Sequence, residues 1–217
     1  SNSSTNLNPC HTFTSPGLYT VSLRAADLQG CFSTYDTVSV VVFAEPEADF
    51  VLPEEVYCGE QQVIDFANTS TGATSYNWTF SNGISSSLTS PSVTFSEQGE
   101  YSVQLLASNT FGCQDALQRS FRIVPQPLAD FAPILIDDCA PQTVVFDNAT
   151  LNATDYFWDF GNGEISTDAN PVIEYNEAGS YDVNLVATYD GLCFDSLQLS
   201  GSVNLLPRPV AAFSWEL

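Results

Sequence analysis

The stretch YFWDFGNG at 156–163 decides the fold class, because it recurs as YNWTFSNG at 76–83. In both copies aromatic residues stand at every second position, the period-two pattern of a half-buried β-strand, and Asn-Gly supplies a turn signal. A second stretch, PVIEYNEAGSYDVNLVAT at 171–188, matches PSVTFSEQGEYSVQLLAS at 91–108 and PCHTFTSPGLYTVSLRAA at 9–26. The chain is therefore built from repeats of strand-forming sequence.

Matching positions in successive copies lie 80 to 82 residues apart, which sets the length of one repeat. We expect an all-β fold of tandem immunoglobulin-like β-sandwiches in a linear array, with complete repeats at 47–126 and 127–208. Residues 1–46 are then the C-terminal half of an earlier repeat, and 209–217 are the start of the next. Half a sandwich cannot bury its own sheet face, so we expect the natural protein to continue in both directions.

Short proline-containing linkers separate the predicted repeats: Glu45-Pro46, Pro125-Gln126-Pro127 and Pro207-Arg208-Pro209. Proline fixes φ and removes a hydrogen-bond donor, so these linkers should be stiff. With strands of about eight residues, each repeat should advance the chain by on the order of 35 Å. A tyrosine follows Gly17, Gly99 and Gly179 by two residues, and we expect it to anchor the turn into the next strand.

The charge balance excludes several classes of partner. The chain has 26 acidic residues against four arginines, no lysine, and a net charge of −22. Nucleic acid and anionic lipid both require a basic surface, so we expect neither as a partner. No apolar run reaches the roughly 18 residues of a membrane span, and we expect no direct membrane insertion.

Side chains suited to catalysis are sparse. His11 is the only histidine, and it aligns with strand positions that face the core, so neither a Ser-His-Asp nor a Cys-His arrangement can recur between repeats. The acidic pairs Glu54-Glu55 and Asp137-Asp138 each precede a cysteine in what reads as an exposed loop, where nothing apolar would raise a pKa. We expect a protein that is not an enzyme.

The repeated tryptophans are the strongest candidates for a sugar-binding platform. Trp78 and Trp158, however, each lie within a strand of alternating aromatic residues. This placement favours a core position over an exposed stacking surface.

WDFGNG, followed by Asn-Pro and G-x-Y-x-V-x-L, resembles the signature of the PKD domain, which centres on WDFGDG. Repeats with one cysteine pair each resemble those of very large Bacteroidota surface proteins, gliding adhesins among them. The resemblance implies an extracellular, cell-surface stalk or filament segment whose partners are neighbouring repeats of the same chain, surface polysaccharide or other cell-surface proteins. The alternative is an accessory carbohydrate- or protein-binding module of a secreted hydrolase.

Two kinds of site follow from that resemblance. Some PKD-like domains of secreted collagenases bind calcium, and the weak counterparts here are Asp155, with Asp159 and Asn162 as a fallback; we expect no other cofactor. Bacteroidota O-glycosylate secreted proteins at a D-[ST]-aliphatic motif, which this chain carries at Asp36-Thr37-Val38 and Asp195-Ser196-Leu197. Thr37 and Ser196 are the implied acceptors.

The cysteines recur with the repeats. Cys58 and Cys139 share one position, and Cys113 and Cys193 share another. Symmetry between repeats then selects Cys58–Cys113 and Cys139–Cys193 as disulfides from the 15 pairings that six cysteines allow. Cys31 is equivalent to Cys113, so its partner would precede Ser1. Cys10 has no counterpart in the later repeats, and it is either free or paired with Cys31.

Overall fold

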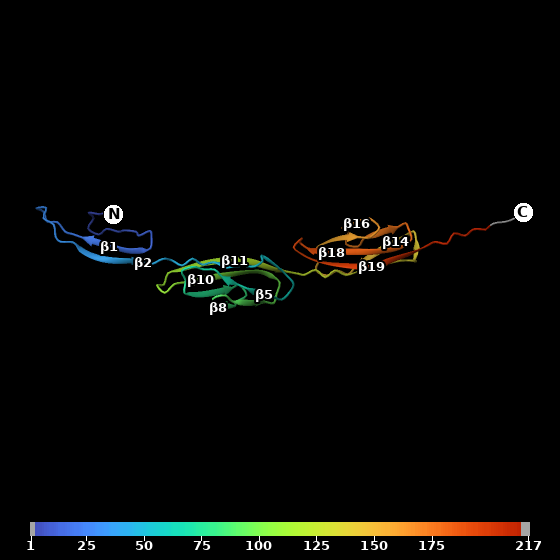
Figure 1. Ribbon diagram of the computed structural model, residues 1–217, viewed down its shortest axis with the longest axis horizontal. Helices are drawn as coiled ribbons and strands as arrows, with labels where there is room; N and C mark the ends of the chain where they lie inside the picture. Colours follow the sequence, from blue (N-terminus) through green and yellow to red (C-terminus); the bar gives the residue numbers. More distant parts are fainter. Residues whose placement is uncertain (1–2, 214–217) are drawn as a thin grey trace. The chain divides into compact units, whose positions relative to one another are not determined.

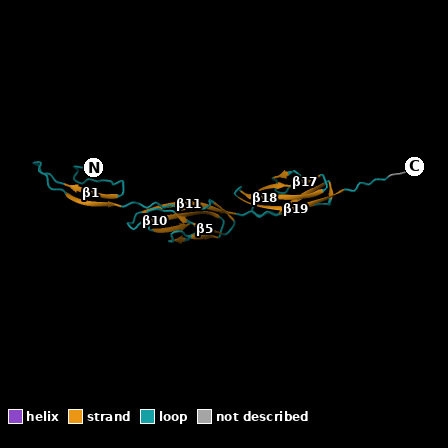
Figure 2. Ribbon diagram, in the orientation of Figure 1, coloured by secondary structure: helices purple, strands orange, loops and turns teal. Residues whose placement is uncertain are grey.

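The computed structural model describes residues 3–213 of the chain. Within that range every regular element is a β-strand, and Figure 2 accordingly shows strands and loops without a helix. The all-β fold class predicted from the repeat is confirmed. None of the described residues forms a helix long and apolar enough to cross a membrane.

The chain divides into two compact units. The first comprises Ser1–Pro53, Asp65–Val93 and Ser102–Ser120, and the second comprises Glu54–Ile64, Thr94–Tyr101 and Phe121–Leu217. The second unit thus takes three short segments of the first complete repeat together with the whole second repeat. Because this division does not follow 47–126 and 127–208, the repeat boundaries stay a prediction from the sequence.

The first complete repeat contains one large sheet and two small ones. The large sheet runs in the order β4 (Val56–Cys58), β11 (Gln114–Val124), β10 (Gly99–Ser108), β7 (Ser75–Phe80) and β8 (Ser85–Ser86). The small sheets pair β3 (Phe50–Val51) with β6 (Ala67–Asn68), and β5 (Gln62–Asp65) with β9 (Ser92–Phe95). β4 pairs with β11 in parallel, which places Cys58 opposite Val124.

The second complete repeat has the same plan (Figure 1). Its large sheet runs in the order β13 (Cys139–Ala140), β19 (Cys193–Pro207), β18 (Gly179–Tyr189), β15 (Asp155–Asp159) and β16 (Ile165–Ser166). The facing sheet joins β12 (Phe131–Ile134), β14 (Gln142–Asn148) and β17 (Val172–Tyr175). β13 pairs with β19 in parallel, with Cys139 opposite Leu206.

Each core is centred on the repeated tryptophan. Trp78 packs edge-on against Phe50, with ring centroids 5.1 Å apart, and Trp158 packs in the same way against Phe131, also at 5.1 Å. Both tryptophans are fully buried, as the sequence predicted. The period-two spacing of aromatic residues in β7 and β15 therefore places one face of each strand toward a core and the other toward solvent, where β15 carries the exposed Phe157.

The predicted tyrosine anchor is confirmed in all three copies. The hydroxyl of Tyr101 donates to the carbonyl of Glu97 at 2.8 Å, and that of Tyr181 donates to Glu177 at 3.0 Å. In the N-terminal segment Tyr19 makes the same bond to Ser15 at 2.7 Å. Each bond ties the tyrosine ring back over the turn that leads into its strand, as in the tyrosine corner of immunoglobulin-like domains.

The N-terminal half repeat forms only a hairpin of β1 (Gly17–Leu23) and β2 (Asp36–Val42). The expectation that His11 lies on a core-facing strand is wrong, because His11 is exposed and outside any strand. Its counterparts Val93 and Ile173 are buried. Their strands β9 and β17 pair with β5 and β14, which come from the first half of a repeat, and residues 3–16 have no such strand to pair with.

The predicted start of a further repeat at 209–217 lies partly outside the described residues. Residues 208–213 form no strand in the structure.

Candidate functional site

Disulfide bonding in the structure differs from the pairing expected from symmetry. Cys58 is bonded to Cys193, with their Cα atoms 5.9 Å apart. Cys113 and Cys139 are half-buried free thiols, and Cys10 and Cys31 are exposed free thiols. Both bonded cysteines belong to the second compact unit. The predicted bonds Cys58–Cys113 and Cys139–Cys193 are therefore wrong.

Strand length explains the error. Cys58 lies opposite Val124 at the end of β11, whereas Cys113 immediately precedes the first residue of that strand. β11 has 11 residues, which span about 36 Å at roughly 3.3 Å per residue. A disulfide requires Cα atoms about 4.4–6.8 Å apart, so the two cysteines of one repeat cannot reach each other.

The two cysteines of the second complete repeat are separated in the same way. Cys193 opens β19, a strand of 15 residues, and Cys139 pairs with Leu206 near its far end. Sequence symmetry identified correctly which cysteines are equivalent, but it does not say which end of a sandwich each one occupies. The strand-forming run of residues between Cys113 and the proline linker was the signal that could have corrected the pairing.

The surroundings of Cys58 and Cys193 place both beside the linker Pro125–Pro127. Next to Cys58, the amide of Gly59 donates to the carbonyl of Val124 at 2.9 Å, and Val124 is the last residue before the linker. Next to Cys193, the Nε2 of Gln126 within the linker donates to the carbonyl of Phe194 at 2.8 Å. The disulfide thus bridges the two sides of a linker.

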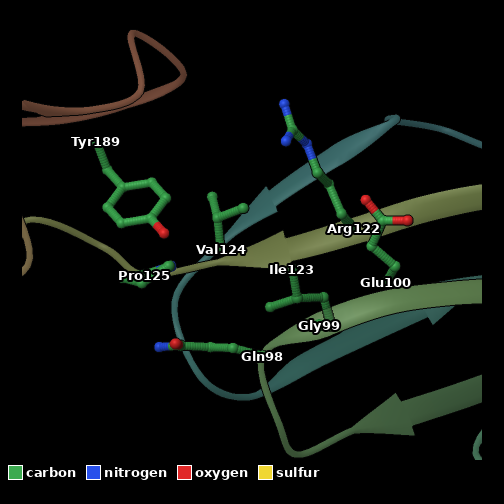
Figure 3. A pocket seen from close by; sticks show the side chains of 8 residues that line it. All are labelled: Gln98, Gly99, Glu100, Arg122, Ile123, Val124, Pro125 and Tyr189. Atoms are coloured by element: carbon green, nitrogen blue, oxygen red, sulfur yellow. The ribbon is translucent and has the colours of Figure 1, made fainter. Parts of the chain in front are cut away.

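An open hollow of about 320 Å³ lies in the same unit, next to this linker (Figure 3). It is lined by Gln98–Glu100, Arg122–Pro125 and Tyr189, and Figure 3 shows the ring of Tyr189 facing the end of β11. Arg122 and Glu100 are the charged side chains of the lining. One cation and one anion on an open surface do not form a catalytic arrangement.

The tryptophans cannot serve as sugar-stacking platforms in this fold. The indole Nε1 of Trp78 donates to the carbonyl of Leu88, and that of Trp158 donates to Asp168, both at 2.9 Å. Because both rings are fully buried, neither offers a face to a ligand.

Two of the candidate calcium ligands, Asp155 and Asp159, lie at opposite ends of β15. Asp155 accepts a 2.7 Å hydrogen bond from the hydroxyl of Thr154 at the start of β15. Asp159 stands at the other end of this five-residue strand, where its carboxylate accepts from the amide of Gly161 at 3.0 Å. Asn162 accepts from the amide of Glu164 at 2.9 Å. Across residues 3–213, no cluster of three or more His, Cys, Asp or Glu side chains could hold a metal ion.

The acidic pairs occupy exposed positions, as expected. Asp137 caps the turn before Cys139, where its Oδ1 accepts from the Cys139 amide at 2.8 Å, and it faces Arg208 at 3.4 Å. The carbonyl of Asp138 accepts from the Leu206 amide at 2.7 Å. These contacts are those of a structural turn.

The two motifs proposed for O-glycosylation lie on strands. Thr37 in β2 and Ser196 in β19 are both exposed. The preceding Asp195 is half-buried, and its carboxylate accepts from the amide of Ala129 at 2.9 Å.

Two-layered all-β sandwiches with a buried tryptophan and a tyrosine corner define an immunoglobulin-like class of domain. Within that class, the family model of the PKD domain matches residues 43–124 and again 125–198. These matches cover more than half of the chain, and the chain belongs to the PKD domain family.

Among curated proteins, the chain is similar to the pre-pro-metalloprotease PrtV of Vibrio cholerae, in two strains. The identity is 43% over 65 residues, which are 29% of this chain and 7% of that protein. The chain therefore spans only a small part of the relatives it matches.

Among solved structures, the fibronectin(III)-like modules of Clostridium thermocellum CbhA match 79% of this chain and 100% of theirs, at 12% identity and a TM-score of 0.40. The amphioxus IgVJ-C2 molecule matches 69% of this chain and 98% of its own, at 11% identity and a TM-score of 0.35. A calcium-stabilised, ice-binding adhesin of an Antarctic bacterium matches 89% of this chain and 58% of its own, at 9% identity and a TM-score of 0.31. At these values the likeness is one of general fold.

Proposed function

We propose that this chain is a structural spacer, a stalk or filament segment of a large repetitive cell-surface adhesin. The observation that carries the proposal is the use of the repeated aromatic residues. Trp78 and Trp158 are fully buried, and their indole N–H groups are bonded to backbone carbonyls. The tryptophans that the repeats share therefore maintain the sandwich and offer no ring face to a ligand.

The net charge and the disulfide also fit a role as a spacer outside the cell. A net charge of −22 favours solubility and repulsion between neighbouring arrays, which suits segments packed on a cell surface. A disulfide fits an oxidising, extracellular environment. Tandem domains of this family are typically non-catalytic modules, and we propose that this segment contributes no turnover. In gliding bacteria such a filament would transmit movement from the cell to a surface.

Deletion within the parent protein tests the spacer role. Removing residues 127–208 as one repeat should shorten the reach of the adhesin while adhesion per displayed molecule is retained. A matched variant with alanine at His11, Asp137 and Asp138 keeps the length and should behave as wild type. Loss of adhesion with unchanged surface display in the deletion, or loss of a turnover rate in the alanine variant, would contradict the proposal.

A second candidate is an accessory carbohydrate- or protein-binding module of a secreted hydrolase, which the match to a part of a pre-pro-metalloprotease favours. Isothermal titration of residues 1–217 with soluble polysaccharides distinguishes the two. A spacer gives no heat of binding, whereas saturable binding abolished by substitutions around the hollow at Arg122 would favour the accessory module.

We also propose that Thr37 and Ser196 carry O-linked glycans, because both lie in D-[ST]-aliphatic motifs and both are exposed. Asp115-Ala116-Leu117 follows Cys113 in the same way as Asp195-Ser196-Leu197 follows Cys193, but it lacks the hydroxyl and serves as the internal control. Peptide mass spectrometry of the native protein should find added hexose mass at Thr37 and Ser196. Unmodified peptides at both positions would end this idea.

A further inference from the structure

The cysteines of the repeats fall into two structural classes. We call Cys58 and Cys139 the exit cysteines, because each lies on a short strand that pairs with the last strand of its sandwich, opposite Val124 and Leu206 respectively. Both partners stand at the point where the chain leaves the sandwich for a proline linker. The two exit cysteines are 81 residues apart and occupy the same place in the fold.

We call Cys31, Cys113 and Cys193 the turn cysteines, because each closes the turn before the last strand of its repeat. In the turn at Cys113 the amide of Asn109 donates to the Cys113 carbonyl at 3.0 Å, and at Cys31 the amide of Asp27 donates to the Cys31 carbonyl at 3.0 Å. The equivalence read from the sequence is therefore also structural.

In the complete repeats, Cys113 and Cys193 lie at the other end of the sandwich, beside the incoming linker. At Cys113, the Nδ2 of Asn109 in the same turn donates to the carbonyl of Ala44 at 2.8 Å, and Phe111 stacks on Phe43 with ring centroids 3.8 Å apart. At Cys193, the incoming linker makes a different contact with the same end of the sandwich, in which the Nε2 of Gln126 donates to the Phe194 carbonyl. A linker is thus flanked by the exit cysteine of the repeat that it leaves and the turn cysteine of the repeat that it enters.

We propose that every junction of this array carries one disulfide, from the exit cysteine of one repeat to the turn cysteine of the next. Cys58–Cys193 is the one junction for which residues 1–217 hold both halves. Under this proposal Cys113 and Cys139, which are free thiols in the structure, each belong to a junction with another repeat. Cys139 then pairs with the turn cysteine of the repeat that follows it, and Cys113 with the exit cysteine of the repeat that precedes it.

The oxidation follows ordinary thiol–disulfide exchange. The two thiols form one S–S bond and give up two electrons and two protons to a protein disulfide of a secretory thiol oxidase, which becomes a dithiol. Each junction is then spanned twice, by the linker backbone and by the disulfide. This goes beyond a spacer role, since it gives consecutive repeats a second covalent connection that limits bending and carries tension past the linker.

Counting thiols in the isolated chain is the first arm of the test. Maleimide labelling of the denatured, unreduced protein should find four free thiols, at Cys10, Cys31, Cys113 and Cys139. Cys58→Ser should raise that count to five, because it releases Cys193, whereas Cys113→Ser should lower it to three. Label confined to Cys10 and Cys31, with Cys113 and Cys139 unlabelled, would mean pairing within each repeat and would overturn the proposal.

The second arm uses the complete protein secreted by its own host, alkylated before digestion. Peptide mapping without reduction should recover Cys139 joined to a cysteine of the following repeat and Cys113 joined to one of the preceding repeat. Recovery of Cys139 or Cys113 as an alkylated thiol, or joined within its own repeat, would refute the repeated junction. The linkages are determined whether or not the protein adheres, so failure here is distinct from failure of the spacer role.

Discussion

The half repeat at the N-terminus and the first complete repeat contain nearly the same hairpin in different surroundings. Val21 and Leu23 of β1 align with Val103 and Leu105 of β10. The side chains of Val103 and Leu105 are fully buried, whereas Val21 is 44% and Leu23 is 71% exposed. The same strand pattern therefore produces a core in one region and an apolar surface in the other.

The difference separates local from long-range determinants of this fold. The hairpin register from Gly17 to Leu23 and the tyrosine bond from Tyr19 to Ser15 both form in the half repeat. Burial does not, because the facing layer is supplied by the strands of the first half of a repeat. Secondary structure and the tyrosine corner are local properties here, and the core is a property of the whole repeat.

The largest expected effect comes from one matched pair of substitutions, which tests this comparison. Leu105→Ala should destabilise the first complete repeat by about 2–5 kcal/mol, since it opens a cavity in a packed core. Leu23→Ala, at the aligned position, should change stability by less than about 0.5 kcal/mol, because that side chain is exposed. Urea denaturation of both variants gives the two values, and equal losses would mean that the half repeat has a core of its own.

The bonded and free cysteines offer a second comparison. Cys58→Ser removes the constraint on a 135-residue loop and should cost about 2–4 kcal/mol of unfolding free energy. Cys113→Ser changes a free, half-buried thiol and should cost less than about 1 kcal/mol. The measurement is urea denaturation without reductant. If adding reductant destabilised Cys58→Ser as much as the wild type, a disulfide other than Cys58–Cys193 would be the one that stabilises the protein.

The two complete repeats should differ in their response to alkali. Tyr175 is buried and donates to the Phe160 carbonyl at 3.0 Å, and desolvation raises the pKa of its phenol well above the ordinary value of 10.0. Its stabilising contribution is complete below pH 10.0, and it is lost as the pH rises toward the folded pKa. The unfolding free energy should fall by about 1.4 kcal/mol per pH unit in that range.

Phe95 occupies the aligned position in the first repeat and has no phenol to titrate. Desolvation also raises the pKa of Tyr57 in the first repeat, but less than that of Tyr175, so the second repeat should lose more stability. For the wild type, the urea midpoint at strongly alkaline pH should lie below the midpoint at mildly alkaline pH. For Tyr175→Phe the two midpoints should lie closer together. An unchanged alkaline loss in Tyr175→Phe would assign that loss to other groups.

The smallest expected effect concerns the tyrosine corner. Tyr101→Phe removes the 2.8 Å bond to Glu97 and should cost about 0.5–1.5 kcal/mol. Tyr19→Phe removes the equivalent bond in the half repeat and should leave the stability of the complete repeats unchanged. Urea denaturation measures both, and a loss from Tyr19→Phe would couple the half repeat to its neighbour.

The sequence was sufficient for the elements that depend on short-range pattern. The all-β class, the buried Trp78 and Trp158 and the tyrosine anchor all follow from period-two alternation and from the recurrence of the repeat. It was also sufficient to sort the cysteines into equivalent pairs.

The sequence alone did not predict the disulfide pairing, because the pairing depends on the end of the sandwich at which each cysteine lies. Symmetry between repeats is satisfied equally by a bond within each repeat and by a bond from each repeat to the next. Only the strand that separates Cys113 from Val124 distinguishes the two, since it places the cysteines of one repeat at opposite ends. The exposure of His11 was missed for a related reason, because alignment with buried residues does not supply the pairing strand.

Hydrogen exchange along the chain tests the central claim, that a sandwich needs both halves of its repeat. Amides of β10 and β11 should exchange at rates set by global unfolding of the repeat, orders of magnitude more slowly than the aligned amides of β1 and β2. Comparison of the segments around Val103 and Val21 by mass spectrometry gives the result directly. Equal protection of these two segments would contradict the account, since the hairpin would then be stable without its facing layer.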